Sequence, residues 1–390
     1  MKASSFTLLL LALGTALTAT HGREPETREP PMRLTITALP SVAPAPTANA
    51  TTPAKVSLGR LLFFDPILSA TGDVACATCH SPALGWADGR ATPIGVNGAG
   101  IGPERKRLES DSFPIIARNA PTVLNVGFNG MTADGKCDPA SAPMFWDSRV
   151  LSLEAQALVP MRAAEEMRGD VCAETAAIDE AVKRVRGNEE YRGRFAKAFG
   201  SDTAVNANNL AKALAAFERS LVTADSPFDR FARGDAAALT PLQKRGLESF
   251  QTAGCALCHS GPMFSNYKLH FIGTPGQREA RDFRTPTLRN LKHTSPYMHN
   301  GSLSTLTDVL NFYDRLMDAT SETLDGGDAT AQLALDPLLK KLNVEPDEFP
   351  AIEAFLDALN DDTYDRSVPE RVPSGLPVPG STLPPPVLRR

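Results

Sequence analysis

The pentapeptide Cys-x-x-Cys-His occurs twice in this chain, as Cys76-Ala-Thr-Cys79-His80 and as Cys255-Ala-Leu-Cys258-His259. The pattern is typical of c-type haem attachment. Two cysteines three residues apart lie on one face of a helical turn, so each thiol can bond one vinyl group of the porphyrin. The histidine that follows can bind the iron as its proximal ligand. One copy would also suit a zinc knuckle or a thiol pair, but two copies in an exported chain predict two covalent c-type haems.

The N-terminal residues have the pattern of an export signal. Lys2 is followed by an apolar run from Phe6 to Leu17 and then by small residues that end near Gly22. Such a run is typical of a secretory signal peptide, here residues 1–22, and is too short for a membrane span. The rest of the sequence predicts no membrane span and no lipid anchor. We therefore expect a periplasmic protein, in the compartment where c-type haem is attached.

The remaining cysteines and histidines limit the other sites that the chain can form. Four of the six cysteines belong to the haem motifs, which leaves Cys137 and Cys172. In an oxidising compartment these two are expected to form a disulfide; the alternative is two free buried thiols. Beyond the signal region and the proximal ligands, the histidines that remain are His270, His293 and His299. The net charge of −5, without a basic stripe, argues against nucleic acid as a partner.

Composition sets the two ends of the chain apart from its centre. Residues 23–54 are rich in Pro, Thr and Ala, which predicts a linker without a core of its own. Residues 367–390 have a similar composition and are expected to form either a free tail or a segment that lies across the body. Between these ends, the length suggests about two domains, which we place at residues 55–225 and 226–366.

The centre of the chain contains a weak internal duplication. Gly59-x-x-x-Phe63 precedes the first haem motif and Gly246-x-x-x-Phe250 precedes the second. Each predicts a short helix with a small residue at the point where it crosses another backbone. A longer helix is expected over 205–222, where one apolar face is marked by Leu210, Leu214, Phe217 and Leu221. The predicted fold is mostly α, with two tandem cytochrome c-like domains that each bind one haem.

Further motifs lie between and around the haem sites. They are Gly59-Arg60-Leu-Leu-Phe63-Phe-Asp65-Pro66, Arg118-Asn119-Ala-Pro121-Thr122, Phe145-Trp146-Asp147, Phe217-Glu218-Arg219-Ser220-Leu221, Ser226-Pro227-Phe228-Asp229-Arg230-Phe231, Cys258-His259-Ser-Gly261-Pro262, Thr285-Pro286-Thr287-Leu288-Arg289-Asn290 and Pro296-Tyr297-Met298-His299-Asn300-Gly301. With these motifs in this order, about two-thirds of the chain resembles the bacterial di-haem cytochrome c peroxidases and their relative MauG.

The resemblance implies different tasks for the two haems. The haem on His80 would be the peroxidatic one, and the haem on His259 would transfer electrons. A tryptophan lies between the two haems in this family, and Trp146 matches it.

The resemblance also implies a distal pocket on the peroxidatic side. Gln156, Pro160 and Glu166 follow Trp146 at the family's spacings. The family's glutamate moves protons while the O–O bond of peroxide breaks. This role agrees with general acid–base chemistry, because a base must take the peroxide proton and return it to the leaving oxygen.

One departure concerns the sixth ligand of the first haem. Many of these peroxidases carry a histidine, in a Ser-Ile-Gly-His-Gly stretch, that blocks the peroxidatic iron until the other haem is reduced. The corresponding stretch here is Pro93-Ile94-Gly95-Val96-Asn97-Gly98, and a valine cannot bind iron. The resemblance therefore implies a first haem that is open to peroxide without prior reduction.

The second departure concerns the sixth ligand of the second haem. The peroxidases use a methionine in the helix after the Pro-Tyr-Met-His motif, whereas MauG uses a tyrosine. Tyr313 falls at this position, with Met317 or His270 as the alternatives. An anionic oxygen ligand stabilises oxidised iron, whereas a thioether favours ferrous iron.

The family implies further features of the region between the domains. A calcium ion would be held by the side chain of Asn119 and the carbonyls of Thr294 and Pro296, because hard cations prefer oxygen ligands. His270 and His299 match family histidines, which we interpret as structural. A Cys137–Cys172 disulfide would clamp the loops around the distal pocket, or would only staple surface loops.

Together these features predict a periplasmic di-haem peroxidase with MauG-like iron ligation. It would use hydrogen peroxide to oxidise a Trp or Tyr residue of a partner protein, which in some relatives is a secreted copper-binding protein. The first alternative is a cytochrome c peroxidase that removes peroxide with electrons from a small cytochrome or cupredoxin. The second is a di-haem electron carrier without enzymatic activity.

Overall fold

Short helices dominate the structure, a computed structural model that describes residues 33, 35, 37–109, 112–201, 204–277, 281–319 and 335–381, with only the backbone for 317–319. The helices are α1 (Pro53–Phe64), α2 (Cys76–Cys79), α3 (Leu153–Gln156), α4 (Ala177–Gly187), α5 (Glu189–Phe199), α6 (Ala207–Ser220), α7 (Pro227–Ala232), α8 (Pro241–Thr252), α9 (Leu306–Ala319) and α10 (Phe349–Asp357). Three antiparallel pairs of two-residue strands join β1 (Gly98–Ala99) to β2 (Lys106–Arg107), β3 (Pro143–Met144) to β4 (Val150–Leu151), and β5 (Leu269–His270) to β6 (Phe283–Arg284). The prediction of a mostly α fold is confirmed.

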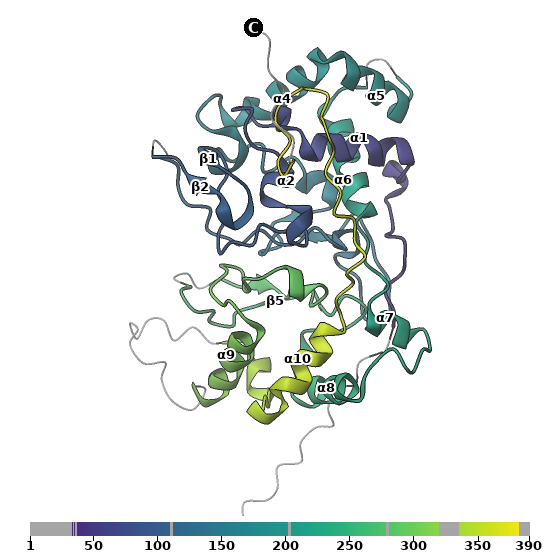
Figure 1. Cartoon of the computed structure of the whole chain (residues 1–390), viewed down its shortest axis with the longest axis vertical. Helices are drawn as coiled ribbons and strands as arrows, with labels where there is room; N and C mark the ends of the chain where they lie inside the picture. The colour runs from purple at the N-terminus through teal and green to yellow at the C-terminus, as the bar shows by residue number, and fades with distance from the viewer. Residues whose placement is uncertain are drawn as a thin grey trace, which may run out of the picture. The chain divides into compact units, whose positions relative to one another are not determined.

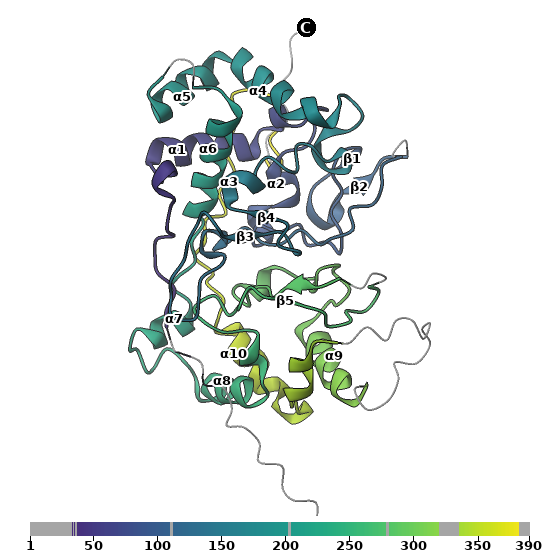
Figure 2. The same cartoon turned by 180° about the vertical axis from the view of Figure 1, so that it is seen from behind.

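A close crossing of two helices occurs once in each half of the fold. The first half contains α1–α6 and the second contains α7–α10 (Figures 1 and 2). A Cβ atom on Gly59 of α1 would lie 1.9 Å from the carbonyl oxygen of Ala213 in α6. A Cβ atom on Gly246 of α8 would lie 1.8 Å from the carbonyl oxygen of Ala351 in α10. Both crossings predicted from the internal duplication are confirmed.

Each crossing carries an aromatic pair at the same place. The ring centroids of Phe63 and Phe217 lie 5.3 Å apart in the first half. Those of Phe250 and Phe355 are also 5.3 Å apart in the second half. The two pairs belong to separate clusters of buried apolar side chains. The fold therefore consists of two cytochrome c-like domains in tandem, each with its own core.

The crossing glycines give a prediction for stability. Gly246→Ala should lower the free energy of unfolding by about 3 kcal/mol, because the added methyl group forces two backbones apart. Gly193→Ala is the matched control: this glycine also lies in a helix, but no atom is found within 4 Å of its added Cβ. That change should stabilise the protein by about 0.5–1 kcal/mol. Urea denaturation of the haem-loaded variants measures both, and equal effects would contradict the close crossing.

The segment before α1 lies against the body of the protein. Leu39 and Ala43 are buried, and the backbone N–H of Leu39 donates to Oδ1 of Asp229 over 2.9 Å. The side-chain amide of Asn49 donates to Oε1 of Glu154 over 2.7 Å. Over the described residues, the few apolar and amide side chains of this stretch anchor it to the body, and its assignment as a linker without a core of its own stays a prediction. The expected signal peptide lies outside the described residues.

The segment after α10 returns to the first half of the fold. The indole N–H of Trp86 donates to the carbonyl of Asp365 over 2.9 Å, and the hydroxyl of Ser374 donates to Asp65 over 2.5 Å. Figure 1 shows this segment, in yellow, running from α10 past α6 towards α4. Of the two alternatives for the tail, residues 367–381 therefore lie across the body, whereas 382–390 are outside the described residues.

The longest predicted helix is α6, and its apolar face is confirmed. The helix begins at Ala207, after the cap Asn206, and ends at Ser220, so it is shorter than expected at both ends. The side chains of its predicted apolar face, Leu210, Leu214, Phe217 and Leu221, are all buried. Within the part of the chain that the structure describes, no helix is long and apolar enough to cross a membrane.

Candidate functional site

Both Cys-x-x-Cys-His motifs line one cavity of about 540 Å³. Its volume falls in the usual range for ligand and cofactor pockets. The other predicted site residues that line it are Trp146, Gln156, Pro160, Glu166, Tyr313, Asn119, Thr294, Pro296, His270 and His299. The fold thus brings together residues that are more than two hundred positions apart in the sequence. Cys137 and Cys172 are not among the lining residues.

The two proximal histidines are held in the same way. Nδ1 of His80 lies 3.2 Å from the carbonyl oxygen of Trp86, and Nδ1 of His259 lies 3.0 Å from that of Phe264. When Nδ1 donates to a carbonyl, the lone pair of Nε2 is free for a metal. Burial lowers the pKa of both imidazoles, that of His259 to about 4, so both rings are neutral as an iron ligand must be.

The four motif cysteines fit covalent haem better than a zinc ion. No two of them are bonded to each other. Burial raises their pKa values, to about 12 for Cys79 and about 11 for Cys258, so no thiolate is stabilised. Among the described residues, no group of three or more His, Cys, Asp or Glu side chains is arranged to hold a metal ion. The alternative of a zinc knuckle is therefore not supported.

Two loops near the proximal histidines, residues 121–125 and 286–290, share a second sequence repeat, Pro-Thr-x-x-Asn. Thr122 donates its hydroxyl to the carbonyl of Gly85 over 2.5 Å, and Thr287 donates to that of Met263 over 2.7 Å. The repeat ends at Asn125 and Asn290, whose φ angles are +61° and +64°, a left-handed conformation that asparagine tolerates. This duplication was not recognised in the sequence, although both copies are visible there.

Trp146 is tied to both halves of the fold. Its indole N–H donates to the carbonyl of Asn119 over 2.9 Å, and its own carbonyl accepts the backbone N–H of Arg284 over 2.7 Å. Asn119 and Arg284 stand at equivalent positions, each two residues before the proline of the repeat. The fold thus holds Trp146 between its two halves, the place that the resemblance implies.

Glu166 lies in a π-helical turn, Ala164–Arg168, that lines the cavity. Burial raises the pKa of its carboxyl group to about 7, and the neighbouring charge of Glu165 adds to the rise, while Arg149 opposes it. The backbone packs tightly here, because a Cβ atom on Gly95 would lie 2.4 Å from the carbonyl oxygen of Glu166. A carboxyl group with this pKa can both accept and donate a proton near neutral pH.

Val96 follows Gly95 in this tightly packed loop. Its side chain is 2% exposed and belongs to the apolar cluster of the first half. It is not among the residues that line the haem cavity.

Tyr313 has an unpaired hydroxyl group beside the second haem motif. The side chain lines the cavity from α9, and burial, with smaller contributions from Cys258 and Cys255, raises the pKa of its phenol. Within the described part of the chain, no hydrogen bond to this hydroxyl is found, and the side chain is partly exposed in the cavity. An iron ion bound at His259 would supply a partner.

The two alternative ligands of the second haem iron, His270 and Met317, differ from Tyr313 in their surroundings. Both ring nitrogens of His270 have partners: Nδ1 lies 2.6 Å from Oδ2 of Asp336, and Nε2 lies 3.3 Å from the amide nitrogen of Asn266. This agrees with the interpretation of His270 as structural. The side chain of Met317 lies outside the described residues.

The three calcium ligands implied by the resemblance lie around the same cavity. The side-chain amide nitrogen of Asn119 donates to the carbonyl of Arg90 over 2.7 Å. Thr294 and Pro296 line the cavity from the loop before β-bridge residue Tyr297. Calcium binding stays a prediction.

Cys137 and Cys172 are the two cysteines of the predicted disulfide, and they are not bonded to each other in this structure. Cys137 packs against the cluster that includes Phe128 and Met263, and its thiol donates to the carbonyl of Asn129. The backbone carbonyl of Cys172 instead accepts from Arg168, just before α4. The pairing of these two cysteines stays a prediction.

Glu218 is a cavity residue that the sequence analysis missed. Its side chain is 6% exposed, and burial raises the pKa of its carboxyl group to about 8. The signal was present, because Glu218 follows Leu210 and Leu214 at helical spacings and therefore lies on the apolar face of α6.

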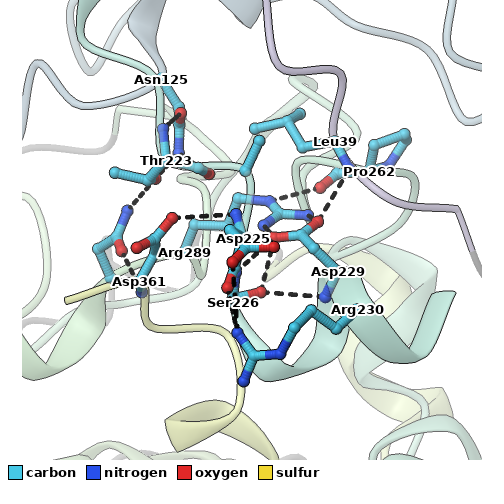
Figure 3. A network of polar contacts seen from close by, with 12 residues as sticks. Leu39, Asn125, Thr223, Asp225, Ser226, Asp229, Arg230, Pro262, Arg289 and Asp361 are labelled. Carbon is cyan, nitrogen blue, oxygen red and sulfur yellow. Dashed lines mark hydrogen bonds and ion pairs between the residues drawn. The ribbon is translucent and has the colours of Figure 1, made fainter. Parts of the chain in front are cut away.

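A buried ion pair supports the loop after the second haem motif (Figure 3). Arg289 binds both carboxylate oxygens of Asp229, at 2.8 and 2.9 Å, and donates from Nε to the carbonyl of Pro262 over 2.7 Å. Asp229 also accepts from Ser226 and from the backbone of Leu39. The pair therefore joins the second haem loop, the start of α7 and the N-terminal segment.

Comparisons with known proteins agree with this site. The family model for di-haem cytochrome c peroxidase matches residues 53–237. The chain is 34% identical to the methylamine utilization protein MauG of Methylorubrum extorquens, over 85% of each chain. It is 32% identical to the cytochrome-c peroxidase IdrP1 of Pseudomonas sp. strain SCT, over 92% of this chain and 93% of that protein.

The solved structures give the same result. The crystal structure of a MauG-like protein associated with microbial copper homeostasis covers 87% of this chain and 96% of its own, with 26% identity and a TM-score of 0.64. With the sequence relatives and the two haem motifs in one cavity, the conclusion is that this chain belongs to the di-haem cytochrome c peroxidase family, the family of MauG.

Proposed function

We propose that this protein is a periplasmic, MauG-like di-haem peroxidase that uses hydrogen peroxide to oxidise a Trp or Tyr residue of a partner protein. The observation that carries the proposal is the phenol of Tyr313, which lines the cavity with Cys255 and Cys258 and has no hydrogen-bond partner among the described residues. An oxygen ligand at this place favours the oxidised iron of the second haem. When bound, the two haems take the oxidising equivalents from peroxide.

The protein side chains supply proton transfer and positioning. Glu166 takes the proton of peroxide and returns it to the leaving oxygen, which its pKa of about 7 permits. Gln156 and Pro160 complete the distal wall of the cavity. Trp146, fixed by hydrogen bonds to both halves, lies on the route of electrons between the haem sites.

The partner is proposed by its chemistry. A relative of similar fold is associated with microbial copper homeostasis. This supports a secreted copper-binding protein as the substrate. One calcium ion, held by Asn119, Thr294 and Pro296, belongs to the same proposal.

A cytochrome c peroxidase that takes electrons from a small cytochrome or cupredoxin is the second candidate. It is favoured by the relatives that carry the name cytochrome-c peroxidase at 32% identity. The burial of Val96 in the apolar core supports the first candidate instead, because no histidine stands there to block the first iron. The same residue argues against an electron carrier with two closed irons.

The proposal is tested on the haem-loaded oxidised protein, to which one equivalent of peroxide is added without reductant. We expect a high-spin ferric signal by electron paramagnetic resonance, and an optical change at both haems that persists after the peroxide is consumed. Tyr313→Met should raise the midpoint potential of the second haem and abolish its part of the change. A protein that reacts only after one haem has been reduced would be a conventional peroxidase, and the proposal would be wrong.

A further inference from the structure

Arg284 is a buried cation without a carboxylate partner in the described chain. Its side chain lines the haem cavity and is 9% exposed. Nε donates to the carbonyl of Phe145 over 3.2 Å. No ion pair and no further side-chain hydrogen bond is found for it among the described residues. The guanidinium carbon lies over the ring of Tyr267, 5.4 Å from its centroid.

The charge of each other buried arginine has a partner, although Nε and Nη1 of Arg219 make no hydrogen bond. Arg289 binds both carboxylate oxygens of Asp229, and Arg219 binds Glu154 at 2.6 Å. Arg105 donates to three backbone carbonyls, at 2.6 to 2.8 Å. Burying a charge without a counterion is costly, and one cation–π contact offsets only a small part of that cost. The described residues therefore supply no anion to pair with Arg284, so its partner is expected to come from a bound group.

We propose that the guanidinium group of Arg284 binds a propionate carboxylate of a haem in this cavity. Each haem carries two such carboxylates, and the planar fork of arginine matches a carboxylate with two parallel hydrogen bonds. The acidic side chains that line the cavity are Glu165, Glu166 and Glu218, none of which pairs with Arg284. The haem is thus the anion that the site is built to receive.

The backbone fixes where this positive charge lies. The N–H of Arg284 donates to the carbonyl of Trp146, and its Nε donates to the carbonyl of Phe145. The charge is therefore held beside the tryptophan that links the two halves. Asn119 takes the equivalent position in the first half and donates to a backbone carbonyl, so only the second half provides a cation here.

The contact has a consequence for the haem potential. A propionate is an anion close to the iron, and it favours the oxidised state, which carries one more positive charge. The guanidinium of Arg284 neutralises this anion and thereby favours reduction. The inference depends on the presence of the haems and not on the substrate of the enzyme.

The test is a spectroelectrochemical titration of the haem-loaded protein, after mass spectrometry has confirmed two covalent haems. Arg284→Gln should lower the equilibrium constant for reducing one haem about tenfold, which equals about 59 mV for one electron. Arg284→Lys keeps the charge without the fork and should shift the potential less. Arg192→Gln removes an exposed charge that does not line the cavity, and should leave both potentials unchanged.

Two results would overturn the inference. One is a fully loaded Arg284→Gln protein in which both potentials equal those of the wild type. The other is an Arg284→Lys protein with a shift as large as that of Arg284→Gln, since the charge would then be irrelevant. If Arg284→Gln fails to keep its haems, the lysine variant decides: haem retention by lysine supports the charge contact, and haem loss in both variants contradicts it.

Discussion

Replacement of Glu166 by glutamine is expected to slow the reaction of the haem-loaded protein with peroxide by about 10²–10⁴-fold. Glutamine keeps the size of the side chain and its place in the π-helical turn, but it cannot accept the peroxide proton. Stopped-flow absorbance at the haem bands measures the rate constant. Binding of cyanide to the ferric protein serves as the control, because it reports an open iron without cleavage of an O–O bond.

The pH dependence of this rate identifies the group. Burial and the charge of Glu165 raise the pKa of Glu166 to about 7. Its carboxylate, the form that accepts a proton, is therefore lost as the pH falls below 7, and the rate should fall with it. Glu165→Gln removes one cause of the raised pKa and should move the profile to lower pH while it keeps the rate at high pH. A Glu166→Gln protein with the wild-type profile would exclude this residue as the base.

Replacement of Arg289 by methionine should lower the free energy of unfolding by about 3–5 kcal/mol, because the carboxylate of Asp229 then stays buried without its cation. The two side chains are 1% and 0% exposed. Figure 3 shows how many segments meet at this pair. The loss should be measured by urea denaturation and should be accompanied by broader signals from the second haem, whose loop Arg289 holds through Pro262.

Two control variants separate charge from packing. Arg245→Met breaks an exposed ion pair with Glu348 and should change stability little. Arg289→Met combined with Asp229→Asn should recover part of the loss, because no buried charge is then left unpaired. A double variant as unstable as the single one would show that the packing of Arg289, and not its charge, supports the loop.

The ion pair also has a predictable pH dependence. Burial alone would raise the pKa of Asp229, but Arg289 outweighs it and holds this pKa below its ordinary value of 3.8. The stabilisation is therefore complete above about pH 4 and is lost as the pH falls further.

Local sequence patterns predicted the parts of the fold that depend on residues close together in the chain. The haem motifs, the glycines of the helix crossings and the apolar face of α6 were all predicted, because each is a fixed spacing of residue types. The distal residues came only from the resemblance to a known family. Trp146 and Glu166 have no local pattern that distinguishes them from a core aromatic and a surface acid.

The features that were missed depend on contacts between distant parts of the chain. The N-terminal segment has the composition of a linker, but single anchors such as Leu39 and Asn49 bind it to the body. That Arg284 has no carboxylate partner among the described residues can be recognised only after the side chains around the cavity are placed.

The C-terminal segment has a consequence for biosynthesis. Trp86 lies six residues after the first proximal histidine, and its indole is covered by Asp365, close to the end of the chain. Tyr364 and Val372 complete the same apolar cluster. In chain order these residues follow the whole second domain, so the core of the first domain is completed only after the second domain has been synthesised.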